Sequence, residues 1–412
     1  MSGLRIAVLG TMGADPFAGM AWMHMQIAAG FARCGHDVLY VETTSAWPYD
    51  AEQWRRVDDA SYTLGYLARV TARFGLGERW AYRRSWGDGA WLGPRAADAV
   101  DWLAGADFVF NVAGATAIER DGFDCRRMVL FGTDPVAEEL MYAAGDPRTI
   151  AHVDAHDDVV SYGENLGTSR SPLQPLPRLR ARTRQPVLMD LWDAGPPTRD
   201  VFTTVGNWRQ EGEDAVWQGR PLRWSKHHEF LKVIDVPRRA GRAVELATNL
   251  SKPDEAKVAT DASRDQDPHQ IRTAESLDRE HWRLLQDGGW LVTDGPAISL
   301  DPWPYRNYIV ASRGEFTVAR EFNVVPWSGW FSERSACYLA AGRPVVTQDT
   351  GFSDVLPTGE GLFAFDTADE AVEAIRAIDA DYERHARAAR AIAQDWFRAE
   401  VVLPKLLADL GA

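Results

Sequence analysis

The chain has 412 residues, 45% of them hydrophobic and 25% charged, with a net charge of -14 at pH 7. This length suits two domains better than a single core. Nonspecific nucleic-acid binding is disfavoured, because it needs a basic surface that displaces counterions from phosphates. No run of about 18 apolar residues is present, so a membrane span is excluded. The N-terminal MSGLRIAVLG contains no secretory signal, and we expect a cytoplasmic location.

The N-terminal part of the chain has the pattern of a parallel α/β domain. A helix is predicted over 21–34 and ends at Gly35. Buried strands are predicted at 4–9, 37–42, 106–112 and 126–132. The lengths between these strands fit helices that cover both faces of a sheet. We therefore predict a first, Rossmann-like domain over residues 1–185.

A second unit of the same kind follows a proline-rich connection over 169–200. Its strands are predicted at 201–208, 307–312, 344–349 and 361–365. The charged segment 251–281 is interpreted as a solvated helical face or an insertion. The second domain is predicted over 186–385, and a C-terminal helix over 386–412 is expected to pack back toward the first domain.

The loop after the first predicted strand, GTMGADPFAGM, contains three glycines. Gly10, Gly13 and Gly19 do not keep the spacing of a dinucleotide fingerprint, so a nicotinamide enzyme is disfavoured. His24 follows Gly19 by five residues and is expected near the carboxyl edge of the sheet, where open α/β folds bind ligands. The alternative is a histidine packed inside the helix.

His152 and the segment VDAHDD (153–158) contain ligand types for a divalent metal. Their spacing matches no zinc or calcium pattern, and turn-forming residues are the alternative. We therefore predict no metal site.

Two cations stand at the corner between the strand over 201–208 and the following helix. Arg209 and Lys226 could both face an anion there, whereas two solvated cations are the alternative interpretation.

The stretch SGWFSERS (328–335) opens a helix of small residues. The free N–H groups of a helix start attract anions, and Ser332, Arg334 and Ser335 add donors suited to a diphosphate. An ordinary helix capped by Ser332 is the alternative. Gly342 ends this helix.

These segments together resemble the GT-B glycosyltransferases, in particular the large family-four type group that uses nucleotide sugars. The second domain is similar to the group's donor-binding pattern at Gly342, Pro344, Val345, Val346, Asp349, Gly351, Asp354, Gly361 and Leu362. In the first domain, Gly19 and His24 match a G-x4-H loop, and 35–38 match the group's helix end. The segment 205–208, with Lys226, is similar to the corner that holds the diphosphate.

The resemblance implies an α/β fold of GT-B type, with two Rossmann-like doubly wound domains facing a central cleft. It implies a donor site in the second domain, formed by Asn207, Arg209, Lys226, Glu315, Ser332, Arg334 and Ser335. The acceptor would enter near the loop that contains Gly13 and Gly19. His24 and Asp15 are the candidate catalytic residues.

The sequence also departs from the group's pattern. Gly329 and Cys337 replace the two glutamates that contact the donor, and Asn207 replaces the first cation. Glu315, expected at a helix start, is the candidate substitute acid for ribose or sugar hydroxyls.

The predicted activity is metal-independent transfer of a hexose-type sugar from a nucleoside-diphosphate sugar to a hydroxyl of a small-molecule or glycan acceptor. UDP is the expected nucleotide, with GDP or TDP as alternatives, and no cofactor or nucleic-acid partner is expected. A nucleotide-sugar epimerase and a noncatalytic nucleotide-binding protein remain alternatives.

Overall fold

The computed structural model describes residues 3–118, 124–210, 212, 214–250 and 268–412. The chain divides into two compact units. Unit 1 contains Met1–Leu191, Pro326–Ala336 and Asp395–Ala412, and unit 2 contains Trp192–Val325 and Cys337–Gln394. Both units are built on parallel sheets with helices, so the predicted α/β class is confirmed. Among the helices of the described residues, none has the length and apolar character to cross a bilayer.

The sheet of unit 1 has buried, near-continuous apolar strands, as expected for a parallel sheet covered on both faces. In spatial order its strands are β10 (Leu179–Arg182), β9 (Asp158–Ser161), β8 (Met128–Gly132), β7 (Phe108–Val112), β1 (Arg5–Leu9), β2 (Asp37–Glu42), β5 (Trp80–Arg83) and β6 (Trp91–Leu92). Neighbouring strands are parallel except β5 and β6. The strands predicted in the first domain are confirmed.

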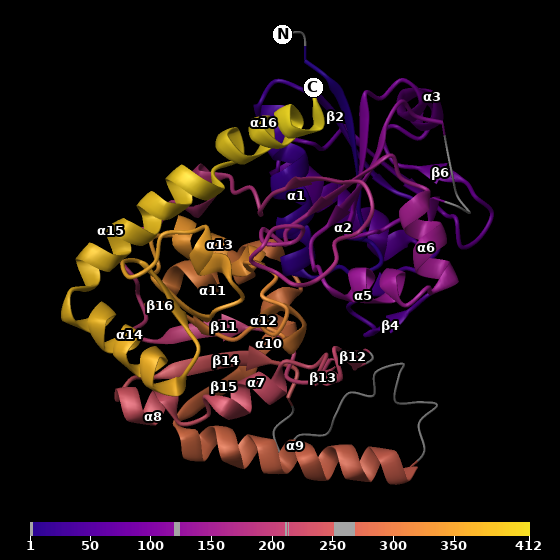
Figure 1. Cartoon of the computed structure of the whole chain (residues 1–412). Helices are drawn as coiled ribbons and strands as arrows, with labels where there is room; N and C mark the ends of the chain where they lie inside the picture. Colours follow the sequence, from indigo (N-terminus) through magenta and orange to yellow (C-terminus); the bar gives the residue numbers. More distant parts are fainter. Residues whose placement is uncertain (1–2, 119–123, 211, 213, 251–267) are drawn as a thin grey trace. The chain divides into compact units, whose positions relative to one another are not determined.

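In the described part of unit 1 the helices are α1 (Ala18–Arg33), α2 (Ser61–Arg73), α3 (Ala99–Ala104), α5 (Ala137–Ala143), α6 (Pro147–Asp154) and α16 (Ala399–Leu410). The C-terminal helix α16 packs on α1 (Figure 1). A Cβ atom at Gly30 would lie 2.6 Å from Leu403 Cδ1, so glycine at this position allows the two helices to approach closely.

Unit 2 repeats this architecture with a fully parallel sheet. Its strands are, in spatial order, β15 (Trp290–Asp294), β14 (Val244–Thr248), β11 (Phe202–Val205), β16 (Gly314–Thr317), β17 (Val345–Gln348) and β18 (Leu362–Phe365). Phe202, Phe316 and Trp290 belong to a core that continues into α8 (Val236–Ala240) and α14 (Ala368–Ala380).

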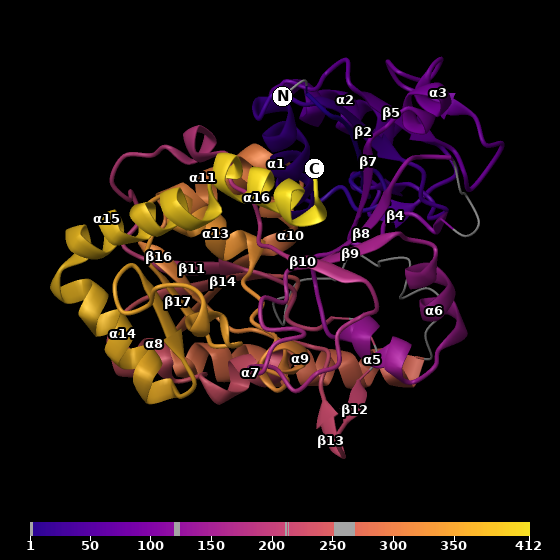
Figure 2. The same ribbon diagram turned by 45° about the horizontal axis from the view of Figure 1, so that its top comes forward.

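Further helices of unit 2 are α7 (His227–Lys232), α9 (Pro268–Gly288), α10 (Gly295–Ser299), α11 (Pro302–Ala311), α12 (Glu321–Val324) and α15 (Tyr382–Ile392). Helix α13 (Glu333–Ala340) contains the boundary between the units. A two-stranded hairpin, β12 (Ala215–Trp217) and β13 (Arg220–Leu222), projects from the body of unit 2 (Figure 2).

Three sequence predictions need correction. The strand predicted over 307–312 is wrong, because these residues lie in and just after α11, which starts at Pro302 under an Asp301 side-chain cap. The connection predicted over 169–200 contains β10, the edge strand of unit 1. The charged segment 251–281 needs no correction: its part from Pro268 on lies in α9, in agreement with the helical alternative, and residues 251–267 lie outside the described residues.

The third correction concerns Glu315. It does not begin a helix but lies fully buried in β16, between Thr203 of β11 and Val345 of β17. Its position is in the amino-terminal half of the strand, whereas ligands of parallel α/β sheets bind at the carboxyl ends. The predicted helix start at Glu315 is therefore wrong, and the role of Glu315 at the donor stays a prediction.

Candidate functional site

A buried polar cluster lies where β1 and β2 end, at the carboxyl edge of the unit 1 sheet. The Glu42 carboxyl group accepts the Gly13 N–H at 2.9 and 2.8 Å through its two oxygens and the Tyr40 hydroxyl at 2.6 Å. The Thr63 hydroxyl donates to the Gly13 carbonyl at 3.1 Å. Strand β2 and helix α2 thus fix the loop after β1 in one conformation.

Packing explains two of the glycines in this loop. A Cβ atom at Gly13 would lie 2.4 Å from Thr63 Cγ2 and 2.7 Å from a Glu42 oxygen, and one at Gly10 would lie 2.3 Å from the Tyr40 hydroxyl. Gly19, by contrast, has no atom within 4 Å of such a position. Gly13 therefore serves the polar cluster, and the roles predicted for Gly13 and Gly19 at the acceptor stay predictions.

His24 is fully buried in α1. Its Nδ1 lies 2.8 Å from the Met20 carbonyl oxygen, which can only accept, so the proton is on Nδ1. Nε2 has no hydrogen-bond partner among the described residues and presents a lone pair. Burial lowers the pKa of His24 to about 4, so the ring is neutral near pH 7. His24 is packed here, as the alternative interpretation stated, and its catalytic role stays a prediction.

We expect His24 to remain neutral, with its proton on Nδ1, down to pH 5.5. Nitrogen-15 NMR of histidine-labelled protein, assigned with His24→Asn, checks this directly. An imidazolium signal for His24 that appears near pH 6.5, or a proton on Nε2, would contradict the burial and the tautomer described above.

Sequence reasoning missed Glu42. Its signal was a carboxylate at the end of the otherwise apolar strand DVLYVE, directly before a loop. Burial raises the pKa of Glu42 to about 8. The second predicted catalytic residue, Asp15, lies in the neighbouring loop, 3.9 Å from the Arg56 guanidinium, with a side chain 48% exposed. Burial raises the pKa of Asp15, and Arg56 partly opposes this shift.

The predicted phosphate-binding stretch is anchored in unit 1. The Trp330 indole N–H donates to the Thr133 carbonyl at 2.9 Å, and the Ser328 carbonyl accepts the Asn165 N–H at 3.0 Å. The Phe331 ring packs on Phe397 with 5.2 Å between centroids. The start of α13 is therefore rigidly placed.

The three predicted donors at this helix start are buried: Ser332, Arg334 and Ser335. The Ser335 hydroxyl has no hydrogen-bond partner in the described part of the chain. Whether these side chains hold a diphosphate stays a prediction.

The structure around Gly329 explains why this chain lacks one glutamate of the donor-binding pattern that it resembles. Its φ is +77°, and a Cβ atom would lie 2.7 Å from the Asn165 backbone nitrogen. An L-residue is strained in this backbone region, and its Cβ would also collide with the backbone at Asn165. The sequence at this position is therefore set by packing, and no carboxylate fits there.

The predicted cationic corner lies at the carboxyl edge of the unit 2 sheet. The Ser225 hydroxyl accepts the Gln210 N–H at 3.1 Å and donates to the Trp208 carbonyl at 3.3 Å. These bonds join the segment that contains Arg209 to the one that contains Lys226, the residue before α7. Asn207 is exposed beside them. Grouping these residues as a donor site stays a prediction.

Arg209 is paired in this structure with residues of α9. Its guanidinium lies 3.2 Å from the Asp278 carboxylate and 3.2 Å from Nδ1 of His281. The Trp208 indole N–H donates to the same His281 nitrogen at 3.0 Å, so this nitrogen is an acceptor and His281 is neutral. An anionic ligand would compete with Asp278 for Arg209.

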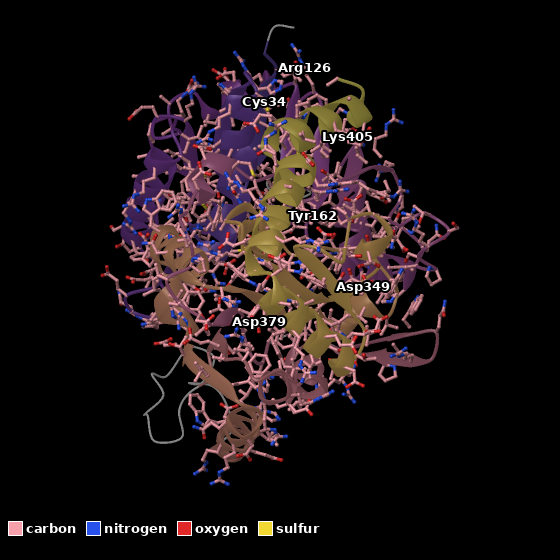
Figure 3. All side chains as sticks on the ribbon, turned by 90° about the vertical axis from the view of Figure 1, so that its left-hand side faces the viewer. Cys34, Arg126, Tyr162, Asp349, Asp379 and Lys405 are labelled. Atoms are coloured by element: carbon pink, nitrogen blue, oxygen red, sulfur yellow. The ribbon has the colours of Figure 1, made fainter. Side chains whose placement is uncertain are left out.

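Asp349 belongs to the donor-binding pattern of the sequence, and His156 to the segment with metal-ligand residue types. Asp349, labelled in Figure 3, follows β17 and accepts the Gly351 N–H at 2.8 Å, which orders the loop after the strand. His156 belongs to the segment 153–158, whose residue types could bind a divalent metal, and its Nε2 accepts from the Asn111 side-chain amide at 3.0 Å. Within the described residues, no group of three or more His, Cys, Asp or Glu side chains is arranged to hold a metal ion.

Solved structures share this fold over the whole chain. Anabaena HepE in complex with UDP and glucose has a TM-score of 0.54 at 12% identity, with 99% of this chain and 100% of that chain covered. HepE in complex with UDP-glucose gives 0.53 at 14%, with 99% of each chain covered. An α-glucosyltransferase in complex with UDP and a 13-mer DNA gives 0.56 at 11%, with both chains fully covered.

These likenesses establish the fold: the chain has the GT-B fold of nucleotide-sugar glycosyltransferases. At this level of identity they concern architecture alone. No protein-family profile and no curated protein sequence matches the chain. The fold class predicted from the sequence is confirmed.

Proposed function

We propose that this protein is a glycosyltransferase that moves a hexose-type sugar from a nucleoside-diphosphate sugar to an acceptor hydroxyl. The observation that carries the proposal is the GT-B fold over the whole chain, shared with an α-glucosyltransferase solved with UDP and with HepE solved with UDP-glucose. UDP is therefore the expected nucleotide. The cationic corner of unit 2 supports the same assignment, because Arg209 and Lys226 stand where parallel sheets bind ligands.

In the proposed reaction, the bond between the anomeric carbon and the phosphate oxygen breaks, and a bond to the acceptor oxygen forms. The nucleoside diphosphate leaves with the electron pair, and the acceptor proton passes to a base. Arginine, lysine and a helix start can neutralise the leaving diphosphate without a metal. Of the two predicted catalytic residues, Asp15 is the exposed one, so we assign the base to Asp15 and a supporting role to His24.

Calorimetry with UDP, GDP and TDP tests the donor site. We expect UDP to bind, and Arg209→Ala to weaken binding roughly 10- to 100-fold, the value of a charge-assisted contact. Asp278→Asn is the matched control, because it frees Arg209 from its ion pair and should leave UDP affinity unchanged or higher. Equal affinities of the wild type and Arg209→Ala would remove Arg209 from the site. Arg334→Ala tests the helix start of α13 in the same way.

Incubation with UDP-glucose and a mixture of saccharides, with and without a chelator, tests the chemistry. Transfer of glucose that persists in the chelator agrees with the proposal. Strict dependence on added divalent metal would contradict the metal-independent mechanism. Conversion of the donor to an isomeric nucleotide sugar without an acceptor would identify an epimerase, and binding without turnover a noncatalytic protein.

A further inference from the structure

Three loops of unit 1 meet at one edge of its sheet. Residues 10–17, 43–59 and 84–90 follow β1, β2 and β5, which are parallel neighbours and therefore end on the same side. The Tyr49 N–H donates to the Gly13 carbonyl at 3.3 Å, and the Ser85 hydroxyl donates to the Thr44 carbonyl at 2.7 Å. The three loops thus form one continuous surface.

This surface presents two indole rings. The Trp47 side chain is 49% exposed and Trp86 is half-buried, with 6.1 Å between the ring centroids and 45° between the ring planes. Both are held in place: the Arg56 guanidinium donates to the Trp47 carbonyl at 2.7 Å, and the Trp86 N–H donates to the Tyr82 hydroxyl at 2.8 Å. Ordered aromatic rings exposed at a ligand-binding edge are typical of a recognition surface.

The backbone of Trp47 is linked through Arg56 to the proposed base, Asp15. Arg56 contacts both the Trp47 carbonyl and, at 3.9 Å, the Asp15 carboxylate. A molecule on the Trp47–Trp86 pair would therefore lie in the same loop cluster as the residue assigned to accept the acceptor's proton.

The geometry distinguishes between ligand classes. Rings inclined at 45° do not form the parallel slot that would enclose a flat aromatic molecule. A pyranose ring has an apolar C–H face that can lie on one indole and a rim of hydroxyls for the surrounding polar groups.

The charges of the three loops also bear on which class of molecule could bind there. Together they contain six acidic and three basic residues. A negatively charged surface disfavours nucleic acid and other phosphate-rich acceptors, which need uncompensated cations. A neutral sugar fits both the charge and the shape.

We propose that the Trp47–Trp86 pair is an acceptor subsite that stacks a neutral pyranose ring, so that the acceptor is a glycan or glycoside. This inference rests on the proposed glycosyltransferase function and adds the chemical class of its acceptor.

Saturation-transfer NMR with cellobiose, maltose and lactose, in the presence of UDP, tests the subsite. We expect at least one disaccharide to bind the wild type through the C–H protons of one ring face. Trp47→Ala and Trp86→Ala should each weaken binding about tenfold, the effect of one lost aromatic contact. Trp47→Phe should retain most of it. Trp396→Ala, which removes an exposed indole elsewhere in unit 1, should have no effect.

The results separate the subsite from the overall function, because UDP binding is measured on the same samples. Unchanged disaccharide binding in Trp47→Ala and Trp86→Ala, or no disaccharide binding to a wild type that binds UDP, would overturn the subsite alone. Preferential binding of 4-nitrophenol or of single-stranded DNA would also overturn it. Failure of the wild type to bind any nucleoside diphosphate would instead overturn the glycosyltransferase proposal.

Discussion

Replacement of Gly329 by alanine is expected to lower the free energy of unfolding by about 3 kcal/mol. About 1 to 2 kcal/mol comes from forcing an L-residue into the left-handed backbone region, and another 1 to 3 kcal/mol from overpacking. Overpacking contributes because the new Cβ would lie 2.7 Å from the Asn165 backbone nitrogen. Urea unfolding followed by circular dichroism measures the change.

Gly359→Ala is the matched control for this prediction. Gly359 also has a positive φ, +98°, but among the described residues no other atom lies within 4 Å of the position that its Cβ would take. Gly359→Ala should therefore show only the backbone cost of about 1 to 2 kcal/mol. Equal effects of the two substitutions would mean that glycine is required at position 329 for its backbone conformation only, without a packing role.

The same variants test whether the start of α13 contributes to UDP binding. If Ser332, Arg334 and Ser335 hold a diphosphate, a displaced 326–331 segment should weaken UDP binding in Gly329→Ala, whereas Gly359→Ala should bind normally. Calorimetry at a temperature where both variants are folded makes this comparison. The Gly329→Glu variant, which introduces the family's acid, should be at least as damaged, because its larger side chain meets the same backbone.

Replacement of Glu42 by alanine is expected to have the largest effect of any single change in the loop cluster, about 3 to 5 kcal/mol. It leaves the Gly13 N–H and the Tyr40 hydroxyl buried without an acceptor, at about 1 to 3 kcal/mol each, and opens a cavity. Glu52→Ala, in the exposed part of the neighbouring loop, should stay within about 0.5 kcal/mol of the wild type. Hydrogen exchange of the amides of residues 10–17 should quicken in Glu42→Ala only.

The pH dependence of stability isolates the ionisation of Glu42. Its pKa is raised to about 8 in the folded protein, above its ordinary value near 4.5. The folded state therefore holds this proton to higher pH than the unfolded chain does. The corresponding stability is fully present below about pH 4.5 and is lost as the pH rises to about 8. Glu42→Gln should flatten this part of the stability profile relative to the wild type, and parallel profiles would contradict the assignment.

The predicted effects agree on one physical picture. Residues of unit 1 that are far apart in sequence fix two backbone segments, the loop after β1 and the stretch before α13, through hydrogen bonds and packing contacts. Both segments contain residues proposed for catalysis or phosphate binding. Preorganisation of such segments avoids an entropic cost when substrate binds.

The sequence by itself determined the α/β class, most strands and the GT-B resemblance, because apolar periodicity and glycine stops are local signals. It predicted a strand at 307–312, where the structure has helix α11, and a helix start at Glu315, where the structure has strand β16. Both segments are short apolar runs, and such runs do not distinguish a buried helix from a buried strand. Only the tertiary structure showed that Glu42 binds Gly13, that His24 is buried and that Gly329 lies against Asn165. These contacts join residues that are far apart in the sequence, and local sequence patterns do not indicate which distant segments pack against each other.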